Sequence, residues 1–267
     1  MLHSLRQFFT RTAEPQAPRA VPQGQRVYAV GDIHGRLDLF DALLDAIAAN
    51  DGVSEPASTT IVLLGDLVDR GDSSAGVIAR ARQLQERCDT RILAGNHEEM
   101  FLRSFDDIEM FRHFIRHGGQ ETVLSYGVDE EAFREATLEQ AQNLMRGVVP
   151  QADIDFMQTF EDMVVIGDYV FVHAGIEPRV PLAEQKRQDL RWIREPFLSH
   201  SQPHELVVVH GHTICEAPED CGNRIGIDTG AYMSGRLTAL RLEGESRMFI
   251  AAVEGEDGAI AATPVHA

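Results

Sequence analysis

Residues 27–35 read VYAVGDIHG, a short apolar run that ends abruptly in glycine, aspartate and histidine. The same arrangement occurs twice more, in IVLLGDLVDRG at residues 61–71 and in RILAGNHE at residues 91–98. Between these segments, apolar residues recur at helical spacing, namely Leu39, Phe40, Leu43, Leu44 and Ile47, and then Val77, Ile78, Ala81 and Leu84. The pattern predicts two consecutive βαβ units, with strands at Val27–Val30, Thr60–Leu64 and Arg91–Ala94.

The rest of the chain divides into a helical part and a strand-rich part. Between Met100 and Asp162 the period is helical, with breaks at Gly118-Gly119, Gly127 and Pro150. Strand character then returns at Met163–Ile166, Tyr169–His173, Leu206–Val209, Arg224–Ile227, Leu237–Leu242 and Met248–Val253, with one helical stretch near Ala183–Arg194. We therefore expect an α/β (α+β) fold, a four-layer αββα sandwich of two packed mixed sheets flanked by helices.

Composition limits the environment and the partners of the chain. Acidic residues outnumber basic ones by 42 to 24, so the net charge of −18 opposes binding to nucleic-acid polymers and to anionic membranes. No apolar run is long enough for a membrane helix, and three scattered cysteines do not form a disulfide framework. We expect a cytoplasmic protein with a flexible tail at residues 1–25, one catalytic domain at 26–253 and a second tail at 254–267.

Polar side chains follow each of the first three predicted strands. Asp32 and His34 follow the first, Asp66, Asp69 and Arg70 the second, and Asn96 and His97 the third. Successive loops lie about 30 residues apart, which is the length of one βαβ unit, so all three should meet at the carboxyl ends of the parallel strands. The glycines beside them allow the backbone to turn sharply.

The second half of the chain adds histidines at the ends of two later strands. These are His173 in FVHAG and the pair His210 and His212 in VHGHT. Oxygen and nitrogen ligands together suit Mn²⁺, Fe or Zn²⁺ better than Ca²⁺. The sequence therefore predicts a metal site that brings both halves of the chain together.

The five motifs GDIHG, GDLVDRG, GNHE, FVHAG and VHGHT occur in the order found in the calcineurin-like metallophosphoesterases, and the chain resembles their phosphoprotein phosphatase branch from about Val27 to Val253. The resemblance implies two divalent metal ions, in the first place Mn, with Fe or Zn as alternatives. It assigns one ion to Asp32, His34 and Asp66, and the second to Asp66, Asn96, His173 and His212. In VHGHT the family motif assigns the ligand role to the histidine after glycine, which is His212. His210 is therefore expected to be a strand-end residue near the site.

The resemblance also implies how the reaction would proceed. A hydroxide held between the two metals would attack phosphorus directly, with no phosphoenzyme. His97 would be the general acid for the leaving group, and Asp69 would orient it and stabilise its charged form. Arg70 and Asn96 would contact the phosphate. From its own chemistry, Arg194 is the candidate for a further phosphate contact, or else a surface arginine on an amphipathic helix. Tyr232 would be either a site residue or a packing residue. Ala94 departs from the family pattern, in which many members have arginine before GNHE.

Three functions are compatible with these residues. The preferred prediction is a bacterial-type serine/threonine protein phosphatase, because GNHE and VDRG are both complete. The alternative is a symmetrical dinucleoside tetraphosphate hydrolase, whose bacterial members share several of these motifs, including the DTG found here at residues 228–230. The third, an interaction protein without catalysis, is disfavoured because every expected ligand is present. The partner is accordingly a phosphorylated protein or small molecule, with no nucleic-acid polymer and no membrane.

Overall fold

The structure is a computed structural model that describes residues 19–265, and it contains two mixed β-sheets. The first sheet has six strands in the order β11-β10-β9-β1-β2-β3. Its strands are β1 (Gln25–Val30), β2 (Ser58–Leu63), β3 (Asp89–Ile92), β9 (Arg236–Glu243), β10 (Ser246–Glu254) and β11 (Ile260–Val265). Strands β1, β2 and β3 are parallel, as the βαβ pattern predicts, and β9 to β11 are antiparallel to their neighbours.

The second sheet has five strands in the order β4-β5-β6-β8-β7. They are β4 (Met163–Ile166), β5 (Tyr169–Val172), β6 (Val207–His210), β7 (Glu219–Asp220) and β8 (Arg224–Gly226). Strands β5, β6 and β8 run parallel, and β4 and β7 complete the edges as antiparallel strands. Both sheets are therefore mixed.

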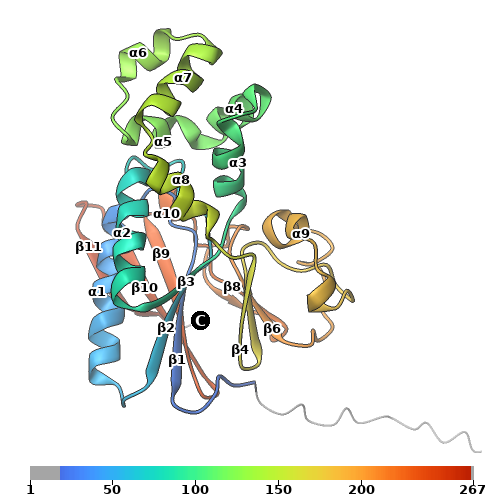
Figure 1. Ribbon diagram of the computed structural model, residues 1–267. Coiled ribbons are helices and arrows are strands. Elements are labelled where there is room, and N and C mark those ends of the chain that lie inside the picture. The colour runs from blue at the N-terminus through green and yellow to red at the C-terminus, as the bar shows by residue number, and fades with distance from the viewer. Residues whose placement is uncertain (1–18, 266–267) are drawn as a thin grey trace, which may run out of the picture.

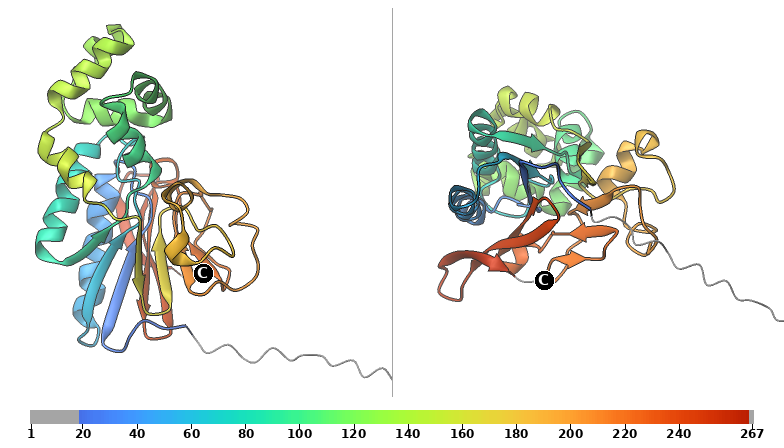
Figure 2. Two further views of the ribbon diagram at one scale, coloured as in Figure 1. Left: turned by 45° about the vertical axis from the view of Figure 1, so that its right-hand side comes forward. Right: turned by 90° about the horizontal axis from the view of Figure 1, so that it is seen from below.

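Side chains on opposite faces of the strands make the four layers. On β1, Tyr28 and Val30 face the helices α1 (Leu37–Val53) and α2 (Ser74–Arg87), whereas Val27 and Ala29 pack against the second sheet. A smaller cluster under α9 (Arg187–Trp192) covers the outer face of the second sheet. Figures 1 and 2 show the resulting helix, sheet, sheet and helix layers. The predicted fold class is confirmed.

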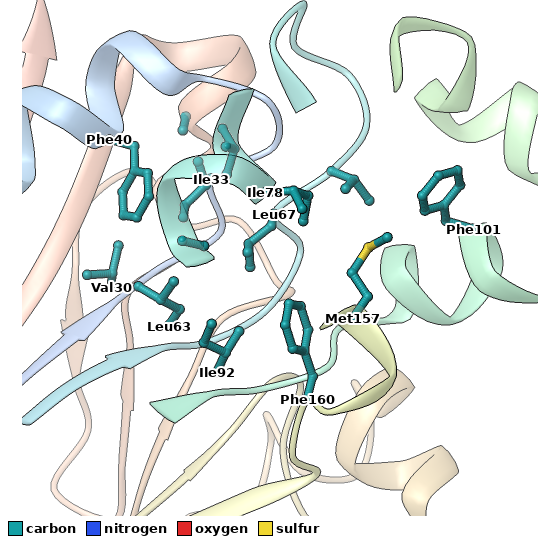
Figure 3. Close-up of a cluster of buried hydrophobic side chains, with 14 of the residues drawn as sticks. Val30, Ile33, Phe40, Leu63, Leu67, Ile78, Ile92, Phe101, Met157 and Phe160 are labelled. Carbon is teal, nitrogen blue, oxygen red and sulfur yellow. The ribbon is translucent and has the colours of Figure 1, made fainter. Parts of the chain in front are cut away.

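A group of helices stands above the first sheet, beyond the carboxyl ends of its parallel strands (Figure 1). We call residues 96–158 the helical insert. It comprises α3 (Asn96–Ser104), α4 (Ile108–Phe114), the π-helical turn η1 (Ile115–Gly119), α5 (Gln120–Ser125), α6 (Glu130–Glu135), α7 (Leu138–Val148) and α8 (Gln151–Gln158). Figure 3 shows the core beside β1 and β2 continuing through Met157 to Phe101 of the insert. The insert is thus packed onto the sheet domain through a shared apolar core.

Both predicted tails differ in part from the structure. Within the expected C-terminal tail, Ile260–Val265 pairs with β10 as strand β11, because the exposed edge of β10 offers its backbone groups to a segment without strong patterning of its own. Within the expected N-terminal tail, Val21 is buried and the Ala20 N–H donates to Asp168. Residues 1–18 lie outside the described part of the chain.

Three shorter elements were not predicted from the sequence. They are β7, the 3₁₀ turn η2 (Leu182–Glu184) and the single turn α10 (Ala231–Ser234). Each is too short to show a period of its own. No helix within residues 19–265 has both the length and the apolar character that a membrane span requires.

Candidate metal centre and active site

The loops after β1, β2, β3, β5 and β6 meet in one buried cluster. Asp32, His34, Asp66, Asn96 and His173 are all less than 5% exposed, although most are charged or strongly polar. Glycine makes this convergence possible: a Cβ at Gly95 would collide with the Asp66 carboxylate, and one at Gly31 would lie 2.5 Å from the carbonyl oxygen of Ile227. The predicted site residues therefore come together as the strand topology requires.

Backbone carbonyls fix the orientation of two of the histidines. Nδ1 of His34 lies 2.8 Å from the carbonyl oxygen of Val68, and Nδ1 of His173 lies 2.8 Å from that of Leu64. Burial lowers the pKa of both imidazoles, so each is neutral and carries its single proton on Nδ1. Each Nε2 therefore presents a lone pair to the cluster, which is the usual arrangement of metal-binding histidines.

Several acceptor atoms face one another across the centre of the cluster. Nε2 of His173 lies 2.9 Å from Oδ1 of Asn96 and 3.4 Å from Oδ1 of Asp66. Nδ1 of His212 lies 2.8 Å from the same Asn96 oxygen. Because the proton of His173 is on Nδ1, its Nε2 has no hydrogen to share with the oxygens of Asn96 and Asp66. A cation between these lone pairs would turn the repulsion into coordination.

Two further atoms point to the same conclusion. Oδ1 of Asp32 and Nε2 of His212 are buried and have no hydrogen-bond partner within residues 19–265. Burial raises the pKa of Asp32, and the nearby carboxylates of Asp228 and Asp66 raise it further, so the carboxylates repel one another without positive charge between them. The donor set thus fits divalent metal ions.

The side chains that could hold a metal ion form two groups that share Asp66, which we call the metal-ligating groups. One consists of His34, Asp66 and His97, and the other of Asp66, His173 and His212, with one ligand atom per residue and all atoms of a group within 4.8 Å of one another. Asp32 contacts the second group by accepting a hydrogen bond from the backbone N–H of His212. Asn96 contacts it through the imidazoles of His173 and His212. A carboxylate common to both groups is the arrangement expected of a bridging ligand.

His97 pairs with Asp69 rather than with a backbone carbonyl. Its Nδ1 lies 2.5 Å from Oδ2 of Asp69, and both residues are buried. Burial alone would lower the pKa of His97, but the charges of Asp66 and Asp69 and the hydrogen bond to Asp69 raise it above its ordinary value. The imidazole can therefore carry a proton at neutral pH.

Two arginines lie near the histidines of the cluster. The guanidinium of Arg70 donates to Nε2 of His34 at 2.8 Å and lies 3.0 Å from Nε2 of His97. It also lies over the ring of Tyr232, 4.6 Å from its centre, and that ring packs edge-on against His34. Tyr232 is thus part of the site surroundings. Burial, and then the charge of His173, lower the pKa of His212 to about 3. The exposed Arg194 lies close enough to lower this pKa further.

His210 lies outside both metal-ligating groups. Its ring packs edge-on against Phe197 at 5.0 Å, and burial lowers its pKa to about 4. It is a neutral core residue at the end of β6, which agrees with the expectation from the motif.

Sequence reasoning assigned no role to three buried residues around the cluster. The Glu98 carboxylate accepts hydrogen bonds from the N–H groups of Gly95, Asp66 and Leu67 at 2.7–2.9 Å, and so ties two site loops together. Asp228 lies beside Asp32, and Thr122 contacts Asp69. Glu98 belongs to GNHE, Asp228 to DTG and Thr122 to the segment just after Gly118-Gly119, but only the folded chain shows which site residues they touch.

Comparison with known proteins connects this geometry to a family. A model described as calcineurin-like phosphoesterase matches residues 25–226. The chain is 27% identical over 231 residues to a protein of Anoxybacillus flavithermus named bis(5'-nucleosyl)-tetraphosphatase PrpE, with the qualifier asymmetrical, and the match covers 79% of this chain and 88% of the relative.

Solved structures share the fold. One, provisionally named a diadenosine tetraphosphatase, superposes with a TM-score of 0.60 at 20% identity and covers 92% of this chain and 98% of its own. A cold-active protein tyrosine phosphatase superposes with a TM-score of 0.57 at 18% identity, covering 91% and 81%. At these identities the structures support the fold alone.

Proposed function

Because the chain belongs to the calcineurin-like phosphoesterase family and is a hydrolase, we propose that its substrates are dinucleoside tetraphosphates. The observation that carries this proposal is the extended match to relatives named bis(5'-nucleosyl)-tetraphosphatase, which spans most of both chains. It reverses the preference for a serine/threonine phosphatase that the motifs suggested. It also favours asymmetrical over symmetrical cleavage, since the relatives' names carry that qualifier.

A pocket lined partly by α3, the helix that begins with Asn96 and His97, supports a substrate with several phosphates and a base. Its volume is about 530 Å³, and it is lined by residues of α3 and α9, both of which are labelled in Figure 1. It is lined by Glu99, Arg103, Arg187, Gln188 and Trp192. Arginines bind phosphate oxygens and an indole can stack on a base, whereas the chain as a whole carries a net charge of −18. In the free protein both arginines pair with carboxylates, Arg103 with Glu99 at 3.6 Å and Arg187 with Asp162 at 3.0 Å. A chain of phosphates would exchange these weak, exposed ion pairs for its own contacts with the two guanidinium groups.

We assign the metals to the residues the family motifs select. Asp32, His34 and Asp66 would hold one ion, and Asp66, Asn96, His173 and His212 the other, with Mn²⁺ as the first candidate and Fe or Zn²⁺ as alternatives. When bound, such ions supply a water-derived nucleophile at neutral pH and neutralise phosphate charge.

The chain's own side chains bind the substrate and move the proton. The Arg70 guanidinium, which contacts Nε2 of His34 and Nε2 of His97, has a planar pair of N–H donors that could hold the reacting phosphate. Arg194 and Asn96 would contribute further phosphate contacts. His97 would donate a proton to the leaving oxygen, and Asp69 would keep that proton on the imidazole and fix the ring.

A phosphomonoesterase acting on phosphoproteins is the second candidate, and the buried His97 and Asp69 pair favours it. A serine or threonine alkoxide is a strong base that must be protonated as it leaves. A nucleotide leaves as a phosphate that is already a stable anion, so a dedicated acid contributes less. The pair is therefore more useful to an enzyme that also cleaves monoesters.

Product analysis tests the proposed function. Diadenosine tetraphosphate is incubated with the Mn²⁺-supplemented enzyme, and the products are separated by ion-exchange chromatography. Asymmetrical cleavage gives AMP and ATP in equal amounts, which we expect. ADP as the only product would show symmetrical cleavage, and an unchanged dinucleotide in an enzyme that hydrolyses phosphopeptides would refute the proposal.

A further inference from the structure

The loop that carries Asp69 and Arg70 has a strained backbone. Both residues have left-handed conformations, with φ of 74° and 72°. For residues with a side chain this conformation costs roughly 1–2 kcal/mol each, so it persists only where the surroundings determine it. The strain thus draws attention to the groups that hold this loop.

The helical insert supplies several of those groups. The Asp69 N–H donates to Oγ1 of Thr122 at 2.8 Å and to Oγ of Ser74 at 3.0 Å. The Arg70 N–H donates to the carbonyl oxygen of Gly118 at 2.9 Å. Gly118 itself has φ of 103°, and a Cβ there would lie 2.6 Å from the Arg70 side chain, so only glycine allows this approach.

The proton of the Thr122 hydroxyl has one strongly favoured acceptor. Oγ1 of Thr122 lies 2.6 Å from Oδ1 of Asp69 and 3.0 Å from Oγ of Ser74. The shorter contact is to a carboxylate, and a hydrogen bond to an ionised acceptor is the stronger one. Thr122 therefore donates to Asp69, and Ser74 can donate its own proton to Thr122.

Asp69 is consequently held on both of its oxygens. Oδ2 faces Nδ1 of His97 at 2.5 Å, and Oδ1 receives the Thr122 hydroxyl. Thr122 and Asp69 are each fully buried, so water does not replace either bond. The position of the His97 ring then depends on a hydroxyl that comes from a helix of the insert, α5.

We propose that Thr122 is a positioning residue of the reaction, which acts on His97 through Asp69 and so makes the helical insert part of the active site. The proposal rests on the assignment of His97 as general acid in the proposed function. It does not depend on whether the natural substrate is a dinucleotide or a phosphoprotein.

The test compares two aryl phosphates with different leaving groups. Nitrophenolate leaves readily without a proton, whereas phenolate is more basic and gains more from an acid. For Thr122→Val, which removes the hydroxyl and keeps the shape, we expect kcat on phenyl phosphate to fall roughly 10- to 100-fold, with a much smaller change on 4-nitrophenyl phosphate and little change in KM. Thr122→Ser, which keeps the hydroxyl, should restore most of the rate.

Thr90 on β3 provides a matched control. It is also buried, but its hydroxyl has no hydrogen-bond partner within residues 19–265. Thr90→Val should therefore leave both rates unchanged. A second control, Ser125→Ala, removes the 3.0 Å bond from the Ala75 N–H and the 2.7 Å bond to the carbonyl oxygen of Thr122, so it loosens α5 but leaves the Thr122 hydroxyl in place. This control shows whether a loosened insert alone lowers the rate when the Thr122 hydroxyl is still present to hold the Asp69 carboxylate.

A double-variant cycle with His97→Ala completes the test. If Thr122 acts through His97, Thr122→Val should have no further effect in the His97→Ala background. Equal slowing of both substrates by Thr122→Val would overturn the proposal, and so would a folded Thr122→Ser variant as slow on phenyl phosphate as Thr122→Val. The same loss in Ser125→Ala, or additive effects in the cycle, would also overturn it. If His97→Ala itself shows no dependence on the leaving group, the acid role in the proposed function fails instead.

Discussion

Oδ2 of Asp69 lies 2.5 Å from Nδ1 of His97 in a buried pair at the edge of the metal-ligating cluster. The contact leaves Nε2 as the only ring nitrogen that can face a substrate. We therefore predict that His97→Ala lowers kcat on phenyl phosphate by roughly 10² to 10⁴, the usual contribution of a positioned acid. Its metal content, measured by atomic emission, should equal that of the wild type. Loss of metal would show that His97 is a ligand, as its place near His34 and Asp66 also allows.

Asp66 is the residue that both metal-ligating groups contain. Asp66→Asn replaces a charged bridge by a neutral amide, which is a poor ligand for two cations at once. We expect this variant to retain less metal than either His34→Ala or His173→Ala, each of which affects one group. Equal metal content in Asp66→Asn and the wild type would remove Asp66 from its bridging position.

Chelation should abolish hydrolysis of every substrate, and added Mn²⁺ should restore it, because the nucleophile and much of the charge neutralisation depend on the metals. The measurement is the rate on 4-nitrophenyl phosphate before and after dialysis against a chelator, with metal content followed in parallel. Full activity in a preparation shown to be free of metal would contradict the assigned centre.

The pocket between α3 and α9 should contribute to the binding of large substrates only. Arg103 and Arg187 are mostly exposed, at 55% and 69% of their side chains, so their replacement should not disturb the core. We predict that Arg103→Ala with Arg187→Ala raises KM for diadenosine tetraphosphate roughly tenfold and leaves KM for 4-nitrophenyl phosphate unchanged. Arg134→Ala, at an exposed ion pair on α6, is the control. Equal effects on both substrates would exclude the pocket from binding the distal part of the substrate.

Arg26 should contribute to stability rather than to activity. Its fully buried guanidinium donates to Glu243 at 2.8 Å, to Asp51 at 2.6 Å and to the carbonyl oxygen of Glu55. We expect Arg26→Met to lower the free energy of unfolding by about 2–3 kcal/mol at pH 7, measured by urea denaturation.

The effect of Arg26 should depend on pH in a defined direction. The hydrogen bond from Arg26 lowers the pKa of Glu243 below its ordinary value of 4.5. A carboxyl with a lowered pKa stabilises the folded state fully above its unfolded-state pKa, and this stability is lost as the pH falls through the folded-state pKa. The difference in the free energy of unfolding between Arg26→Met and the wild type should therefore become smaller below pH 4.5. A difference that stays constant down to pH 3 would show that the ion pair contributes little.

The first half of the fold could be predicted because its signals are local. The apolar runs at β1, β2 and β3 and their glycine-rich ends lie within short segments, and the βαβ connection brings those ends together. The position of each ligand follows from the strand that precedes it. Strand β11 could not be found this way, because Ile260–Val265 has no alternating pattern and gains its structure by pairing with β10.

The surroundings of the site depend on contacts between distant residues, which a single sequence does not reveal. Thr122 reaches Asp69 across 53 residues, from a helical segment whose period gives no sign of that contact. Asp228 follows β8 and Asp32 follows β1, and the two come close because the two sheets pack against each other through a shared apolar cluster. The motifs that contain these residues mark them as unusual, but the fold determines what they touch.

The choice of substrate is tested most directly by measuring kcat/KM with one Mn²⁺-loaded preparation on diadenosine tetraphosphate and on phosphoserine, phosphothreonine and phosphotyrosine peptides. The proposed function predicts the highest kcat/KM for the dinucleotide, with AMP and ATP as products and the phosphopeptides hydrolysed more slowly. A higher kcat/KM for any phosphopeptide, with the dinucleotide left intact, would contradict it.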